Sequence, residues 1–136
     1  MTENTPASET PAPTVWPCTS YADAPAAIRF LVEAFGFVET LVVPGEKDRE
    51  IVHAELRWPE GGGVMLGSSC EDSEFGQLTR TSNYVVTDHP DELFKRATDA
   101  GAEVVRELRD EDYGSRGFTV RDPAGNVWSF GTYRGT

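Results

Sequence analysis

The second half of the chain repeats the first half at a spacing of 64 to 65 residues, and this repeat limits the possible folds. At an offset of 65, the matches are residues that start and stop a helix: Asp23, Pro25 and Gly36 fall on Asp88, Pro90 and Gly101. At an offset of 64, the matches surround a turn: Arg57, Pro59, Gly61 and Gly67 fall on Arg121, Pro123, Gly125 and Gly131. Caps, stops and turns require such residues for their backbone geometry. The repeat therefore predicts one structural unit built twice.

Each unit reads as one strand, one helix and three further strands. Apolar residues at helical spacing, ended by a glycine, predict a helix in each half, and alternation of apolar and polar residues predicts the strands. In the first half we expect strands at 15–21, 37–43, 51–58 and 64–67, and a helix from Asp23 to Gly36. In the second half we expect strands at 83–87, 102–108, 117–121 and 127–131, a helix from Asp88 to Gly101, and a charged loop at 109–115. The predicted fold class is α+β, with two tandem βαβββ units.

The chain of 136 residues fits one domain. Residues 1–14 hold three prolines and no aromatic or branched aliphatic side chain, so we expect a disordered N-terminal tail. The periodic pattern also fails at 68–80, which we interpret as a linker between half-units 15–67 and 81–133. The prediction is a single domain at 15–136.

Composition and charge exclude several classes of partner. The chain has 23 acidic and 12 basic residues and a net charge of −11, which argues against nucleic acid and against anionic membrane surfaces. The N-terminal residues show no basic segment followed by an apolar one, as a secretory signal would. No apolar run reaches the length of about 18 residues that a membrane helix needs. The two cysteines, Cys18 and Cys70, form no metal or redox motif, which is typical of a reducing compartment. We expect a cytoplasmic protein.

Four segments carry a resemblance to a known family. They read YADAPAAIRFLVEAFGF (21–37), HAELRWPEGGGVMLG (53–67), YVVTDHPDELFKRATDAGAEVV (84–105) and YGSRGFTVRDPAGNVWSFGTY (113–133). The chain resembles the vicinal oxygen chelate superfamily, which includes glyoxalase I, bleomycin-resistance proteins and extradiol dioxygenases. Its most specific piece is the D-P-x-G-N turn from Asp122 to Asn126. The resemblance implies curved mixed sheets around a cavity, with helices on the outer faces, and a homodimer.

Enzymes of this superfamily hold a divalent metal with His, Glu or Gln from four strands. The resemblance places these positions at Trp16, Met65, Thr81 and Ser129, or at Pro17 and Ser82 if the first-strand register differs by one. A metal-binding relative carries glutamate where Ser129 stands. None of these side chains is a good ligand for a hard or borderline divalent ion. We therefore expect a member without a metal or another cofactor.

Other polar residues offer no better catalytic or metal site. His53, Glu55 and Arg57 share one face of a strand, and we interpret them as a solvent-facing or interface-facing row with local ion pairing. His89 fits a solvated residue in a capping turn. Cys18 has no neighbouring cation to activate its thiol, and we interpret it as a small buried hydrophobe.

A binding cavity remains. If the topology of the superfamily holds, the cavity is lined by Trp16, Cys18, Met65, Val127 and Ser129. Tyr113 and Arg116 lie in a loop that could close over its mouth, and the acidic residues of this loop favour a cationic ligand: Asp110, Glu111 and Asp112. Trp128 and Phe130 should pack against a helix on the opposite face. Alternatively, Trp16 and Met65 fill core between the halves.

We therefore expect a metal-independent protein that binds a small cationic or aromatic molecule and resembles the sequestering proteins of the bleomycin-resistance type. Binding is favoured over enzyme activity because the metal positions carry poor ligands: Trp16, Met65, Thr81 and Ser129. Two alternatives stay open. One is a metal-dependent lyase, isomerase or dioxygenase with ligands at other positions, and the other is a dimeric scaffold that binds no ligand.

Overall fold

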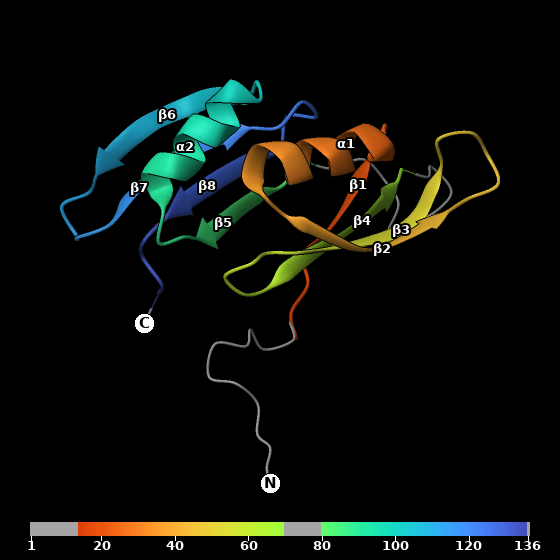
Figure 1. Cartoon of the computed structure of the whole chain (residues 1–136), viewed down its shortest axis with the longest axis horizontal. Coiled ribbons are helices and arrows are strands. Elements are labelled where there is room, and N and C mark those ends of the chain that lie inside the picture. Colours follow the sequence, from red (N-terminus) through yellow and green to blue (C-terminus); the bar gives the residue numbers. More distant parts are fainter. Residues whose placement is uncertain (1–13, 70–79, 136) are drawn as a thin grey trace, which may run out of the picture.

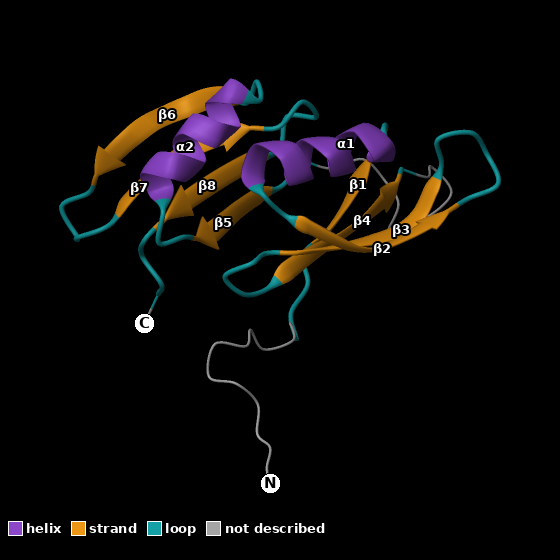
Figure 2. Cartoon of the chain, viewed as in Figure 1, coloured by secondary structure: helices purple, strands orange, loops and turns teal. Residues whose placement is uncertain are grey.

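Each half of the chain folds into a four-stranded sheet with its own helix (Figures 1 and 2). The structure, a computed structural model, describes residues 14–69 and 80–135. The first half contains β1 (Cys18–Tyr21), α1 (Ala24–Phe30) with a π-helical turn η1 (Leu31–Phe35), β2 (Val38–Pro44), β3 (Ile51–Arg57) and β4 (Gly63–Ser68). The second half contains β5 (Ser82–Val86), α2 (Pro90–Asp99), β6 (Glu103–Asp110), β7 (Arg116–Arg121) and β8 (Val127–Gly131). The predicted tail and linker lie almost wholly outside the described residues.

The two sheets have the same topology. Their strand orders are β1-β4-β3-β2 and β5-β8-β7-β6. In each sheet the first strand runs parallel to the last strand of its unit, and the other neighbours are antiparallel. The α+β prediction of two tandem βαβββ units is confirmed.

Both helices end at the glycine that the repeat predicts, and the first helix also begins at its predicted cap. The Asp23 carboxylate accepts a hydrogen bond from the backbone N–H of Ala26 (3.1 Å), and Pro25 lies in the first turn of α1. Gly36 and Gly101 follow the two helices with φ of 93° and 95°, a conformation that glycine adopts without steric cost. Capping and helix stops therefore explain the matched residues of the helices other than Asp88.

Four local differences from the predictions have physical reasons. β1 begins at Cys18 and not at 15, because Pro17 lacks an N–H for the ladder. β6 continues to Asp110, where a loop was expected, because Arg109 and Asp110 pair with β7. The helix α1 ends in a π-helical turn, which an α-helical spacing does not reveal. His89, not Asp88, precedes α2 as its N-cap, and the Asp88 carboxylate accepts a hydrogen bond from Arg134 (2.6 Å).

One hydrophobic core joins the two halves. Phe35 of η1 packs against Trp128 and Phe130 of β8, with ring centroids 5.4 and 4.8 Å apart. Phe37 packs on Trp58 in the first half and also on Trp128 in the second. Trp128 and Phe130 are thus buried on the helix side of their sheet, as predicted.

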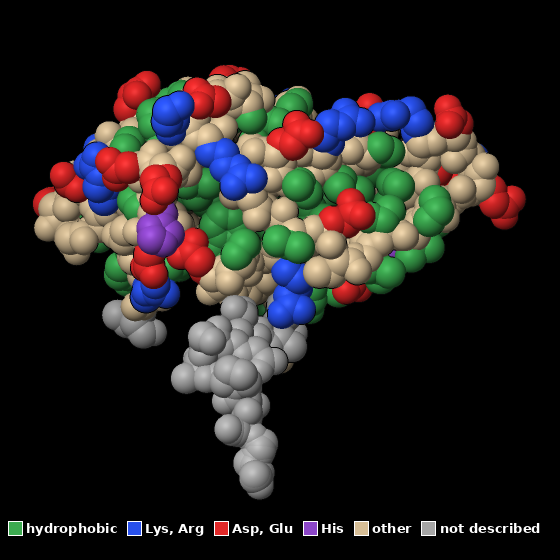
Figure 3. Space-filling model, in the orientation of Figure 1, with side chains coloured by type: hydrophobic (Ala, Val, Ile, Leu, Met, Phe, Trp, Pro, Cys, Tyr) green, Lys and Arg blue, Asp and Glu red, His purple; other side chains and the backbone are tan. Residues whose placement is uncertain are grey.

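Acidic and basic side chains are interspersed on the face of the molecule shown in Figure 3. Several form exposed ion pairs, such as Arg49 with Asp23 and Lys95 with Asp99, each at 2.7 Å. Within 14–69 and 80–135, neither helix has the length and apolar character needed to cross a bilayer.

Candidate functional site

The predicted site residues of the strands lie on the sheet faces that point away from the helices. Alternation along β4 and β8 buries Val64, Leu66, Trp128 and Phe130 on the helix side. Met65, Val127 and Ser129 therefore lie on the opposite side, which carries no helix from residues 14–69 and 80–135 (Figure 2), and we call it the helix-free face of each sheet. Strand pairing adds further residues to the helix-free faces: Cys18, Val38, Leu41, Val43, His53, Glu55 and Arg57 on the first sheet, and Ser82, Tyr84 and Thr119 on the second.

The first helix-free face brings together three predicted residues. Cys18 of β1 lies directly beside Met65 of β4, and Glu55 of β3 lies on the other side of Met65. Trp16 lies against Gly63, where an added Cβ would be 2.8 Å from the indole ring and 2.6 Å from the carbonyl oxygen of Leu56. Neither Trp16 nor Met65 belongs to the core, so the interpretation that they fill core between the halves is wrong.

Cys18 is exposed, which corrects the expectation of a buried thiol. It lies on the edge strand β1, on a face that carries no helix. Its Sγ lies 3.6 Å from the carbonyl oxygen of Trp16, to which it donates a weak hydrogen bond. Exposure makes this thiol accessible to reagents.

The second helix-free face has Ser129 at its centre, between Tyr84 of β5 and Thr119 of β7. The hydroxyl oxygens of Ser129 and Thr119 share a hydrogen bond of 2.8 Å. Val127 pairs with Ser82 and Arg121 in the same sheet. The sequence did not identify Tyr84 and Thr119, because strand pairing is needed to place them beside Ser129.

Tyr113 and Arg116 lie at the β6–β7 end of this sheet. The Arg116 guanidinium pairs with Asp91 (2.9 Å) and Asp110 (3.2 Å), and these hydrogen bonds raise the pKa of Arg116 and hold that of Asp91 below its ordinary value. The ring of Tyr113 meets that of Tyr133 edge to face at 5.8 Å. The Tyr84 hydroxyl donates to the carbonyl oxygen of Tyr133 (2.6 Å). Three partly exposed tyrosines therefore gather here: Tyr84, Tyr113 and Tyr133.

Strand pairing also settles which residues of the two halves are equivalent. Cys18 faces Met65 as Tyr84 faces Ser129, so Cys18 corresponds to Tyr84 and Trp16 to Ser82. Thr81 precedes β5, and its N–H donates to the side-chain oxygen of Asn126 (2.7 Å). With Trp16 at the predicted first-strand position, the four residues are an indole, a thioether and two hydroxyls: Trp16, Met65, Ser82 and Ser129. This set does not fit a hard or borderline divalent ion.

The polar row of β3 contains a local contact between His53 and Glu55, on the face that the alternation predicts. His53 Nε2 lies 2.8 Å from the Glu55 carboxylate, and both side chains are partly exposed. His89 is 68% exposed and lies 3.6 Å from Glu92, as a solvated residue before α2. Among the residues described, no three His, Cys, Asp or Glu side chains are grouped closely enough to hold a metal ion.

The D-P-x-G-N turn connects the halves through Asp122. This buried carboxylate accepts hydrogen bonds from the backbone N–H groups of Ala124 (3.0 Å) and Asn126 (2.9 Å), and from Trp128 Nε1 (3.1 Å). It also accepts from the hydroxyl of Tyr21 in the first half (2.8 Å). Burial, and then the negative charge of Asp122, raise the pKa of Tyr21 far above its ordinary 10.0, so the phenol keeps its proton and donates.

The corresponding turn of the first half reaches the second half in return. Trp58, which the repeat aligns with Asp122, donates from Nε1 to the carbonyl oxygen of Val86 (2.9 Å). The carboxylate of Glu60 accepts from the Thr87 hydroxyl (2.9 Å) and the Asp88 N–H (2.8 Å). Each turn thus binds the junction between the first strand and the helix of the other half. We call these contacts the reciprocal turn contacts.

Comparison with known proteins agrees with this architecture. The chain is 42% identical over 118 residues to an uncharacterized protein of Mycobacterium bovis. This match covers 80% of this chain and 76% of the relative. The crystal structure of TioX from Micromonospora sp. ML1 is 36% identical, with a TM-score of 0.73 over 84% of this chain and 93% of that one. A glyoxalase I mutant from Zea mays shares the fold, at 16% identity and a TM-score of 0.66 over 85% of this chain and 43% of that one.

The family model for the Glyoxalase/Bleomycin resistance protein/Dioxygenase superfamily matches residues 18–130, which include every described strand except the last residue of β8. Together with the paired βαβββ units, this match establishes that the chain belongs to the Glyoxalase/Bleomycin resistance protein/Dioxygenase superfamily.

Proposed function

We propose that this protein binds a small organic molecule on its helix-free faces without the help of a metal ion. The observation that carries the proposal is the chemistry of the side chains at the middle of the sheets. The resemblance puts Met65 on β4 and Ser129 on β8 at positions where metal-dependent members carry carboxylate or imidazole, and Ser129 is hydrogen-bonded to Thr119. These residues suit contact with a ligand better than coordination of a divalent ion.

The side chains on these faces favour an aromatic ligand. Trp16 and Met65 offer apolar surface on one sheet, and Tyr84 offers its ring on the other, with Tyr133 and Tyr113 next to it. Such surfaces, with a few hydroxyl groups, are typical of small-molecule sites. Asp110 and Glu111 are paired with Arg116 and Arg109, so local charge adds little preference for a cation. A positive group on the ligand would instead be attracted by the ring faces.

A second copy of the chain would complete the site. Val38, Leu41 and Val43 of β2 are 51%, 43% and 39% exposed, and pairing places all three on the helix-free face. An apolar row along an edge strand favours association with another surface. We propose that the helix-free face of one chain covers that of its partner, which gives a homodimer.

Metal analysis tests the proposal that the protein works without a metal ion. Protein purified without chelators should contain far less than one equivalent of zinc, nickel, manganese or iron per chain. One tightly held equivalent would overturn the proposal and favour the metal-dependent enzyme.

Ligand binding is tested by thermal unfolding with matched panels of neutral and cationic aromatic compounds, with and without EDTA. A ligand should raise Tm equally in both conditions. Met65→Lys places a charge in the first helix-free face and should abolish the shift. Val52→Lys is the control, because Val52 is 62% exposed and alternation places it on the other face of β3. Equal loss in both variants, or no binder among the compounds, would count against the proposed site.

The dimer is tested separately by sedimentation. The wild-type chain should sediment at twice the mass of one chain, Leu41→Glu should shift it to the monomer, and Val52→Glu should leave it dimeric. A monomeric wild-type protein would refute the shared site but leave binding by one chain open to the thermal experiment.

A further inference from the structure

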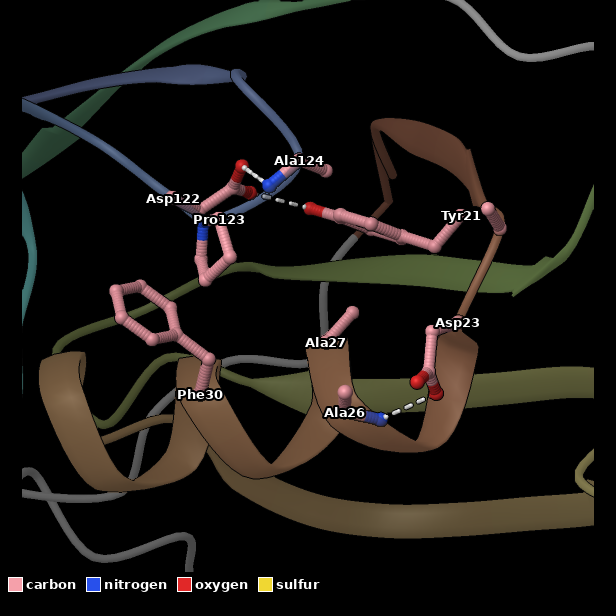
Figure 4. A pocket seen from close by; sticks show the side chains of 9 residues that line it. Tyr21, Asp23, Ala26, Ala27, Phe30, Asp122, Pro123 and Ala124 are labelled. Atoms are coloured by element: carbon pink, nitrogen blue, oxygen red, sulfur yellow. Dashed lines mark hydrogen bonds between the residues drawn. The ribbon is translucent and has the colours of Figure 1, made fainter.

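A cleft lies far from the helix-free faces, between α1 and the turn that contains Asp122. Figure 4 shows its walls: the turn on one side, α1 on the other, and Tyr21 and Phe30 at the two ends. The cleft has a volume of about 230 Å³. Its lining comes from both halves of the chain, since Tyr21 and α1 belong to the first half and Pro123 and Ala124 to the second.

The walls are apolar because four of the side chains end at Cβ. These four are Ala22, Ala26, Ala27 and Ala124. Phe30 closes one end, and its ring is fixed by an edge-to-face contact with Phe35 at 5.4 Å. Pro123 adds a rigid ring on the opposite wall (Figure 4). The cleft therefore offers flat carbon surfaces with little side-chain freedom to lose on binding.

The charged groups of the lining already have partners. The Tyr21 hydroxyl and the Asp122 carboxylate are bonded to one another (2.8 Å), and Asp122 has further donors within its own turn. Asp23 accepts from the N–H of Ala26 and from Arg49, whose guanidinium neutralises its charge at 2.7 Å. A bound molecule would meet no acidic side chain that lacks hydrogen-bond partners, so the lining favours a neutral ligand.

The other half of the chain supplies an internal comparison. The equivalent cleft, between α2 and the turn at Trp58–Gly62, has a volume of about 390 Å³. Its walls carry polar and charged side chains: Glu60, His89, Glu92 and Arg96. Glu60 occupies the position that the repeat aligns with Ala124. Glu92 occupies the position that the repeat aligns with Ala27. The same backbone arrangement thus gives an apolar cleft in one half and a polar one in the other.

We propose that the cleft between α1 and the Asp122 turn is a second binding site, for a small neutral aromatic molecule of one or two fused rings. An apolar cavity of about 150 Å³ is already large enough to bind benzene, and drug-sized ligands need about 300 Å³ or more. A volume between these values suits a single or fused ring system. The site is independent of the proposed helix-free-face site, with which it shares no residue.

Indole is the probe, with tryptamine and indole-3-acetate as ring-matched cation and anion. Titration of the ¹⁵N-labelled full-length protein should shift the amide signals of Ala22, Ala26 and Ala124 with indole. The charged analogues should bind at least about fivefold more weakly, because they lose hydration in an apolar cleft whose acidic groups already have partners. Amides of the polar cleft, such as Glu60 and Glu92, and of the helix-free faces, such as Met65 and Ser129, should stay in place.

Ala26→Leu fills the cleft and keeps a strong helix former at this position. It should weaken indole binding at least about tenfold, as expected when added methylenes occupy the space of the ring. Ala100→Leu makes the same change at an exposed alanine beyond α2 and should leave binding unchanged. Far-UV circular dichroism and Tm confirm that both variants are folded. If Ala26→Leu does not fold, the wild-type shift map alone decides.

Three results would overturn the proposal. The first is the absence of saturable shifts at the cleft with millimolar indole. The second is shifts confined to the helix-free faces or to the polar cleft. The third is binding of tryptamine or indole-3-acetate as tight as that of indole.

Discussion

Asp122, the first residue of the D-P-x-G-N turn, contributes to the stability of the fold. Its side chain accepts hydrogen bonds from groups in both halves, including the buried phenol of Tyr21 and the indole of Trp128. A buried carboxylate is stable only when such donors compensate for its lost hydration. The D-P-x-G-N motif therefore has a structural role at the contact between the two halves. It does not indicate a reaction.

Replacing the two partners of this contact should have unequal effects. Tyr21→Phe removes one hydrogen bond and leaves the carboxylate its other donors, so it should lower the free energy of unfolding by about 1 kcal/mol. Asp122→Ala leaves several buried donors without an acceptor and should cost about 3 kcal/mol or more. Urea denaturation measures both values. A larger loss for Tyr21→Phe than for Asp122→Ala would contradict this account.

The stability of the fold at acidic pH should depend on Arg116. Its hydrogen bond holds the pKa of Asp91 below the ordinary 3.8, so the pair stabilises the fold above that value and loses its effect as pH falls through the lowered pKa. In Arg116→Gln the pKa of Asp91 should rise towards 3.8. NMR titration of the side-chain carboxyl measures it, and Asp23, which pairs with Arg49, serves as the unchanged control. An unmoved Asp91 would show that other groups lower its pKa.

At the scale of elements, α2 holds the end of η1. Arg96 donates hydrogen bonds to the carbonyl oxygens of Glu33 (3.0 Å) and Val32 (3.2 Å) in the last turn of η1, where carbonyl groups run short of helical partners. The Val32 oxygen also accepts a hydrogen bond from the Gly36 N–H (3.1 Å). A cation at a helix C-terminus also interacts favourably with the helix dipole. The two halves thus share a cap that no pattern within one half could reveal.

Arg96→Met keeps much of the side-chain length and removes these donors, so it should lower the free energy of unfolding by about 1 kcal/mol. Lys95→Met is the matched control. It removes only the exposed pair with Asp99 and should cost less than about 0.5 kcal/mol. Chemical denaturation compares the two variants, and equal costs would assign no capping role to Arg96.

Elements governed by local chemistry could be predicted from the sequence. Asp23 and Gly36 bound the first helix, and alternation in β3 separated buried Ala54 and Leu56 from His53 and Glu55. Features that depend on contacts between residues far apart in the sequence could not be predicted from it. Asp110 joins β6 because Arg116 lies across from it, and Cys18 is exposed because its sheet face carries no helix. The equivalence of Cys18 and Tyr84 likewise required the strand register.

At the scale of the whole molecule, the single core predicts a single unfolding transition. Leu31 and Phe35 of the first half and Phe118 and Phe130 of the second belong to one buried cluster. Separation of the halves would expose aromatic surface in both, so neither half should be stable alone. Calorimetry, tryptophan fluorescence and circular dichroism should give one coincident transition. Two resolved transitions would show that the halves fold independently.

The reciprocal turn contacts also bear on the origin of the chain. Tyr21 binds the turn of the second half, and Thr87 and Asp88 bind the turn of the first, so each half gives and receives the same kind of contact. Two separate half-length chains related by a two-fold axis would make this exchange in the same way. A gene encoding one βαβββ unit could thus yield a stable pair before its duplication and fusion. After fusion, each copy was free to change alone, as the alanines of one cleft and the charges of the other illustrate.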